Sequence, residues 1–155
     1  MTYRDTGKEP SLIVPALAPL YERLAILSWP LVRITSGAFL LTHGWPKLMG
    51  GASAFAAGSL TRRGLEPALP LAYIVIFLET VGATLLMLGL FTRLIAFFVV
   101  IEFAVIVYVT LPLGYPWMRP GGGWEYPAFW GLINLAILMR GGGPYSLDRR
   151  FGREF

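Results

Sequence analysis

The sequence predicts an all-α protein, a transmembrane four-helix bundle with an outer-face loop or short amphipathic helix between its first two helices. The chain has 155 residues, of which 55% are hydrophobic and 14% are charged, and its mean hydropathy is +0.62. A soluble domain typically has about 25% charged residues. A bilayer core about 30 Å thick requires about 20 apolar residues per helix, so this length allows about four spans.

Four apolar segments are the expected spans: residues 24–43, 69–90, 94–113 and 124–139. They lack the alternating pattern of a membrane β-barrel, and lipid offers the backbone no water to bond with, so each is expected to be helical. We expect a cytoplasmic or interfacial N-terminal segment at 1–23, the four-helix domain at 24–139 and a cytoplasmic tail at 140–155.

The segment before the first span contains Pro15 and Pro19, which disfavour a regular helix, so residues 12–20 are expected at the membrane interface. The start of the chain lacks the basic region, unbroken apolar region and small-residue cleavage site of a signal peptide, and is expected to be retained.

Basic residues predict the orientation in the membrane. The termini and the second connection hold eight Lys and Arg residues, whereas the first and third connections hold four. The positive-inside rule therefore predicts that both termini lie in the cytoplasm. Residues 44–70 would then lie on the outer face, where Phe55 and Leu60 of an amphipathic turn would contact the membrane.

Three charged residues lie deep within the expected spans: Arg33, Glu79 and Glu102. Such a charge costs about 2.5–3.5 kcal/mol on insertion scales, and usually faces the bundle interior and a partner. Counting about 1.5 Å per residue from the ends of the spans places all three at a similar depth. Glycines on the faces of Arg33 and Glu79 favour close helix approach, so we predict a bidentate Arg33–Glu79 ion pair. This pair either serves a functional site or only fixes helix register.

One arginine cannot neutralise two glutamates. Glu102 is therefore expected either to be protonated through desolvation or to accept a hydrogen bond from Tyr73, Tyr108 or Asn134. A second polar layer is expected nearer the outer surface, and residues 44–70 would roof the resulting cavity. The candidate ligand-contacting residues are Arg33, His43, Trp45, Lys47, Tyr73, Glu79, Glu102 and Glu125.

Composition excludes several kinds of site. The sequence has no cysteine and one histidine, His43, so the chain cannot by itself form a disulfide, an iron–sulfur cluster or a bis-histidine haem site. No catalytic residue and no metal site is predicted. The formal net charge is +4, but the basic residues flank apolar runs, so no nucleic-acid partner is expected.

Three motifs in this order resemble the DoxX family of small bacterial four-helix membrane proteins. They are R-x3-G-x6-G-x2-K-L from Arg33, E-x2-G-x6-G-x2-T-R from Glu79, and G-P-x-S-L-D from Gly143. The resemblance extends from about residue 30 to residue 152. The family pattern falls on Arg33, Gly37, Gly44, Lys47, Glu79, Gly82, Gly89 and Arg93.

The resemblance implies a role beside redox enzymes. Founding members of the family are similar to the small subunits of an archaeal thiosulfate:quinone oxidoreductase. Others are membrane anchors of assemblies that contain a superoxide dismutase and a sulfurtransferase, and distant relatives behave as chaperones or cargo receptors. No catalytic residue is transferred by the resemblance.

The leading hypothesis is therefore an inner-membrane subunit of a redox or respiratory complex, which contacts quinone or quinol in a polar intramembrane cavity and is not catalytic alone. Membrane lipids, other membrane or redox subunits, or further copies of the chain are its expected partners. One alternative is a transporter of a small anion or metabolite, in which Arg33 and Lys47 attract the substrate and Glu102 couples transport to a proton. Another is a non-catalytic membrane scaffold or assembly factor.

Overall fold

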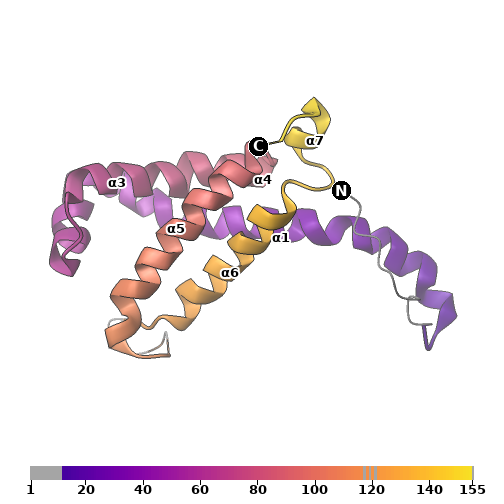
Figure 1. Ribbon diagram of the computed structural model, residues 1–155, viewed down its shortest axis with the longest axis horizontal. Helices are drawn as coiled ribbons and strands as arrows, with labels where there is room; N and C mark the ends of the chain where they lie inside the picture. Colours follow the sequence, from indigo (N-terminus) through magenta and orange to yellow (C-terminus); the bar gives the residue numbers. More distant parts are fainter. Residues whose placement is uncertain (1–11, 117, 119, 121, 155) are drawn as a thin grey trace.

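The computed structural model describes residues 12–116, 118, 120 and 122–154, and in this part of the chain all regular secondary structure is helical. Figure 1 shows two long antiparallel helix pairs. In the first, α1 (Ala18–Gly50) lies along a rod made of α3 (Ala68–Phe77), η4 (Leu78–Gly82) and α4 (Ala83–Leu88). The second pair is α5 (Thr92–Thr110) and α6 (Glu125–Arg140). The short elements are η1 (Pro15–Leu17), α2 (Ala52–Phe55), η2 (Ala56–Leu60), η3 (Thr61–Arg63), η5 (Leu111–Leu113) and α7 (Leu147–Phe151).

Three helical segments are long and apolar enough to cross a bilayer: Pro15–Gly50, Ala68–Leu88 and Thr92–Leu113. The expected fourth span forms α6, whose 16 residues fall just short of the about 17–25 that a spanning helix requires. The all-helical membrane fold is therefore confirmed. A bundle of exactly four spanning helices is not, since α6 is short and additional helices are present.

The first helix begins earlier than the sequence predicted. Pro15 lies in η1 and Pro19 is the second residue of α1, so neither interrupts the helix. The first amides of a helix have no intrahelical acceptor, and proline, which has no N–H, fits there without losing a hydrogen bond. The prolines therefore lie where the helical segment starts, and the expectation that they prevent a regular helix was wrong for residues 15–20. The position of this segment at the membrane interface stays a prediction.

The two helix pairs meet at one end and diverge toward the other (Figure 1). At the end where they meet, a buried apolar cluster joins α1, α4, α5 and α6, and residues 141–154 cover it; we call this the tail end. The cluster consists of Leu40, Ala83, Leu86, Ile95, Ala96, Val99 and Ile137.

At the diverging end, the segment of residues 52–63, here called the roof segment, folds onto α3. Leu60 is buried against Ala68 and Ala72, and Phe55 packs at the edge of the same cluster. The expected helical turns are present, but Leu60 is buried in this cluster instead of contacting the membrane, and Phe55 is half-buried at its edge. Alanines at 68 and 72 leave the surface of α3 flat enough to receive these side chains, which explains the difference.

Candidate functional site

A cavity of about 540 Å³ lies between the diverging helix pairs and beneath the roof segment. Its walls come from α1, α3, α5, α6 and the roof segment, and most of the side chains are apolar. Ile74 of α3 and Ile101 of α5 line it and are also 53% and 46% exposed, so the cavity opens to the surface between these two helices. Its polar lining residues are Ser36, His43, Lys47, Ser59, Arg63, Glu79, Glu102 and Tyr126.

An ion pair between α1 and η4 forms the polar side of this cavity. The Nζ atom of Lys47 donates hydrogen bonds to both carboxylate oxygens of Glu79. The Glu79 side chain is 5% exposed and that of Lys47 is 24% exposed. Lys47 also lies 5.0 Å from the ring centroid of Phe55 in the roof segment, a cation–π contact that ties the roof to the pair.

The predicted Arg33–Glu79 ion pair is not formed. Arg33 is buried at the tail end, where its guanidinium donates to the carbonyl oxygens of Leu86 at 3.3 Å and Tyr145 at 3.2 Å. It does not line the cavity. Gly44, the residue of α1 that contacts the Glu79 backbone, lies 11 residues further along the helix than Arg33, about 16 Å at 1.5 Å per residue.

The antiparallel register explains this correction. Gly44 contacts Glu79, and Gly89 contacts the guanidinium of Arg33. Because the two helices run in opposite directions, the first residue of each motif faces the second glycine of the other motif. Arg33 and Glu79 both begin a motif, so they lie at opposite ends of the contact. Lys47, which follows Gly44 by three residues, lies on the same face and reaches Glu79 instead.

Glu102 is the second carboxyl group of the site. It is 9% exposed, lines the cavity and interacts electrostatically with Glu79 and Lys47. Neither of its carboxyl oxygens accepts from an N–H or O–H donor among the residues that the structure describes, and a hydrogen bond to the neighbouring Glu79 carboxyl group requires a proton on one of the two. The expected partner Asn134 instead donates to Trp130 O at 2.9 Å and accepts from Ser36 at 3.2 Å. A protonated Glu102 stays a prediction.

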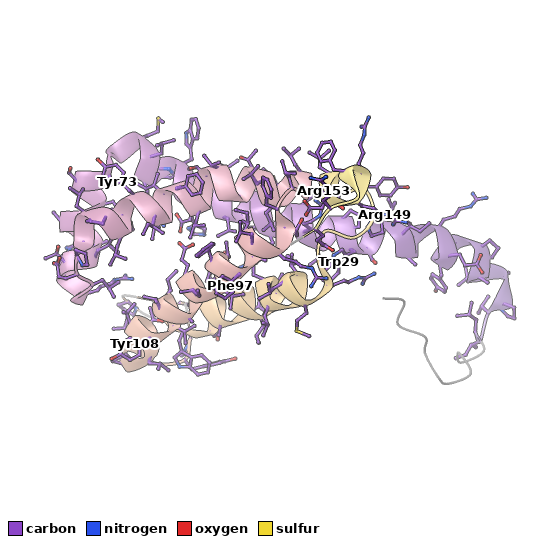
Figure 2. The ribbon with its side chains drawn as sticks, turned by 45° about the horizontal axis from the view of Figure 1, so that its top comes forward. Trp29, Tyr73, Phe97, Tyr108, Arg149 and Arg153 are labelled. Atoms are coloured by element: carbon purple, nitrogen blue, oxygen red, sulfur yellow. The ribbon has the colours of Figure 1, made fainter. Side chains whose placement is uncertain are left out.

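The remaining candidate residues are divided between the cavity and the surface. His43 lines the cavity, whereas Trp45, Tyr73 and Glu125 are not part of its lining. Tyr73 on α3 and Tyr108 near the end of α5, both labelled in Figure 2, are 61% and 74% exposed, so neither is buried beside Glu102.

Sequence reasoning missed several cavity residues, including Ser36, Arg63 and Trp130. Serine and tryptophan are common in membrane helices, and Arg63 belongs to a connection, so no local signal distinguishes them. They become lining residues only through the packing of helices that are distant in sequence.

A second polar cluster at the tail end was also missed. The Asp148 carboxylate accepts from the amides of Phe91 at 2.8 Å and Thr92 at 2.9 Å, and so caps the first turn of α5. Asp148 N donates to Gly89 O at 2.9 Å. The motif G-P-x-S-L-D ends on Asp148, but nothing in its sequence indicates which amides the carboxylate accepts from.

Aromatic and basic side chains complete the tail end. Trp29 Nε1 donates to Gly141 O at 2.9 Å, and the Arg140 guanidinium lies 4.5 Å from the Trp29 ring centroid. Figure 2 shows Trp29 at the same end of the molecule as Arg149 and Arg153 of the tail. This end therefore holds α1 and the tail together and is separate from the cavity.

Comparisons with known proteins agree with this architecture. The sequence pattern described as DoxX matches residues 28–111, which is more than half of the chain. The chain is also 28% identical over 158 residues to a Mycobacterium tuberculosis (strain ATCC 25618 / H37Rv) protein described as "Uncharacterized membrane protein Rv3486", covering 92% of this chain and 94% of that protein. No solved structure matches the chain.

Proposed function

We propose a function on the premise that the chain belongs to the DoxX family of membrane proteins. In this proposal the protein binds a lipid-soluble molecule of the quinone class in the cavity beside Lys47 and Glu79. It does so as a subunit of a redox assembly in the bacterial inner membrane. The observation that supports the proposal is the cavity itself, which has a volume of about 540 Å³ and a mostly apolar lining that includes the Lys47–Glu79 ion pair and Glu102.

The size and lining of the cavity suit such a ligand. Small-molecule sites typically have about 300–1,000 Å³, apolar walls and a few polar groups that fix orientation. Leu71, Ile74 and Ile101 offer apolar walls to a ring and an isoprenoid tail, while Lys47 and Glu102 offer hydrogen bonds to carbonyl or hydroxyl oxygens.

The position of the cavity suits entry from lipid. Glu79 is 11 residues from the start of α3 and Glu102 is 10 residues from the start of α5, about 15–16 Å along each spanning helix. This is the middle of a bilayer core of about 30 Å. The surface opening between α3 and α5 would let a ligand enter sideways from the membrane with its tail still in lipid. In this proposal the roof segment faces outward and the tail faces the cytoplasm.

A partner protein would supply the electron-transferring group. The chain has no cysteine, and the described residues hold no group of three or more His, Asp or Glu side chains suited to a metal ion. The residues of this chain would bind and orient the quinone, and the partner would exchange electrons with it.

Anion transport has less support. That alternative required Arg33 and Lys47 to attract one substrate, but Arg33 lies at the tail end and Lys47 is bonded to Glu79. A scaffold role in which the Lys47–Glu79 pair is only architectural is the alternative that the binding experiment must distinguish.

The test is binding of decyl-benzoquinone, measured by equilibrium dialysis on protein in lipid nanodiscs. Ile101→Trp fills the cavity without removing a polar group, and should weaken saturable binding at least about tenfold, equivalent to 1.4 kcal/mol. Phe97→Trp is the matched control, because Phe97 is one turn away on α5, is equally exposed and does not line the cavity (Figure 2). No saturable binding, or equal losses in the two variants, would reject the proposal. Copurification of a cofactor-bearing protein from native membranes tests the subunit role.

A further inference from the structure

Glu102 is a buried carboxyl group in the lining of the cavity. Glu102 is only 9% exposed, and its two carboxyl oxygens accept no hydrogen bond from an N–H or O–H donor in the described part of the chain. The Glu79 carboxyl group lies within hydrogen-bonding reach, but only a proton on one of the two groups could be the donor. A buried polar group without a partner costs about 1–3 kcal/mol, and more when it is charged. Such a group inside a membrane usually has a functional role.

Charged and titratable groups from several elements surround the cavity around Glu102, which is on α5. The two with which Glu102 interacts electrostatically are Glu79 of η4 and Lys47 of α1. The other such groups that line the cavity are His43 of α1, Arg63 of η3 and Tyr126 of α6.

The charges of the three central groups do not balance if all are ionised. Lys47 supplies one positive charge and directs two hydrogen bonds to Glu79, whereas Glu79 and Glu102 would supply two negative charges. Two neighbouring carboxylates in a low-dielectric site repel each other, and one bound proton removes that repulsion. With one proton on the pair, the net charge of Lys47, Glu79 and Glu102 is zero.

We propose that Glu79 and Glu102 share a single exchangeable proton beside Lys47, and that Glu102 presents this proton as a hydrogen-bond donor to the ligand in the cavity. The second clause rests on the proposed function, and the first does not. In this state Glu102 donates through its hydroxyl to a carbonyl oxygen of a quinone. When the ligand is a hydroquinone, its hydroxyl donates to a carboxylate oxygen of the pair. The ligand class is thus one whose polar oxygens alternate between acceptor and donor.

The first test is infrared spectroscopy of ligand-free protein in nanodiscs at neutral pH. The wild type should show the carbonyl stretch of one protonated buried carboxyl group, and Glu102→Gln should remove it. Glu79→Gln should remove the band as well, because Glu102 is then the one carboxylate beside Lys47. The charge of Lys47 balances that carboxylate, so Glu102 stays ionised. A carboxyl group protonated by burial alone would keep the band in Glu79→Gln.

Two further variants serve as controls for the infrared test. Glu22→Gln, at an exposed position near the start of α1, should leave the band unchanged. Glu102→Asp should retain it and serves if Glu102→Gln folds poorly. Absence of the band from the wild type, or its persistence in folded Glu79→Gln, would overturn the shared proton whether or not any ligand binds.

The second test separates the donor role from the proposed function. Glu102→Gln keeps a hydrogen-bond donor and should bind decyl-benzoquinone within a few-fold of wild type, whereas Glu102→Leu should bind at least about tenfold more weakly. Equal binding by wild type and Glu102→Leu would overturn the donor role alone. If no form of the protein binds quinone, including the wild type, the proposed ligand and the donor role are both rejected. Infrared results as expected would then still support the proton-sharing pair.

Discussion

Gly44 of α1 lies so close to Glu79 of η4 that a Cβ atom at residue 44 would overlap the backbone and the Cβ atom of Glu79. The contact brings α1 against the rod at the level of the cavity and sets Lys47, one turn further along, opposite the Glu79 carboxylate. Close packing by glycine and ion pairing by lysine are thus two parts of one helix contact.

We predict that Gly44→Ala destabilises the protein by about 1–3 kcal/mol, the usual cost of overpacking a filled interior. The neighbouring atoms are backbone and Cβ atoms, so they cannot move aside as the end of a flexible side chain would. The measurement is the midpoint of thermal unfolding in detergent micelles.

Gly50→Ala is the matched control for this substitution. Gly50 is in the last turn of the same helix, and a Cβ atom there has no neighbour within 4 Å. Alanine favours helix over glycine by about 1 kcal/mol in a helix interior, so Gly50→Ala should be neutral or slightly stabilising. Equal destabilisation by both variants would contradict the close contact at Gly44.

The Lys47–Glu79 pair gives a second prediction. Lys47→Met should destabilise the protein by about 3 kcal/mol, because it leaves the buried Glu79 carboxylate without its cation. The combined variant Lys47→Met, Glu79→Met should recover most of this loss, since replacing a buried ion pair with apolar side chains is often neutral.

A double-mutant cycle in the same detergent measures this coupling. If the two single losses simply add in the combined variant, Lys47 and Glu79 do not interact energetically. Arg33→Met with Glu79→Met is the informative comparison, since the structure separates those two residues and their effects should add.

Much of the fold could be predicted because lipid leaves the backbone few choices. The apolar runs at 24–43 and 94–113 lie in helices, and the run at 69–90 is helical as far as Leu88, as hydropathy indicated. Hydropathy could not give the helix ends. Helix α1 extends to Gly50, beyond the apolar run, because Lys47 finds its partner within the protein and no longer requires water.

The site was harder to predict because depth was counted from the ends of apolar runs. Hydropathy identified Glu79 and Glu102 as interior residues and placed Lys47 in a polar layer nearer the outer surface, and all three line the cavity. Pairing Arg33 with Glu79 failed, because α1 extends to Gly50 instead of ending at residue 43, and this shifts the register between the two antiparallel helices. The register depends on which glycine meets which backbone, and that is a property of packing between helices.

The tail gives the last prediction. Asp148 is 4% exposed, and its carboxylate accepts from the amides of Phe91 and Thr92 while Arg33 lies near enough to interact electrostatically. Asp148→Ala leaves two amides without an acceptor and should cost about 3 kcal/mol, at about 1–3 kcal/mol per unsatisfied group. Protease protection of the tail and the unfolding midpoint should both fall, whereas Arg150→Ala, on the exposed side of α7, should change stability by less than about 0.5 kcal/mol.

Because the tail and the cavity occupy opposite ends of the helix contact, folded Asp148→Ala should still bind decyl-benzoquinone like the wild type. A loss of binding without a loss of tail protection would show that Asp148 acts on the cavity directly.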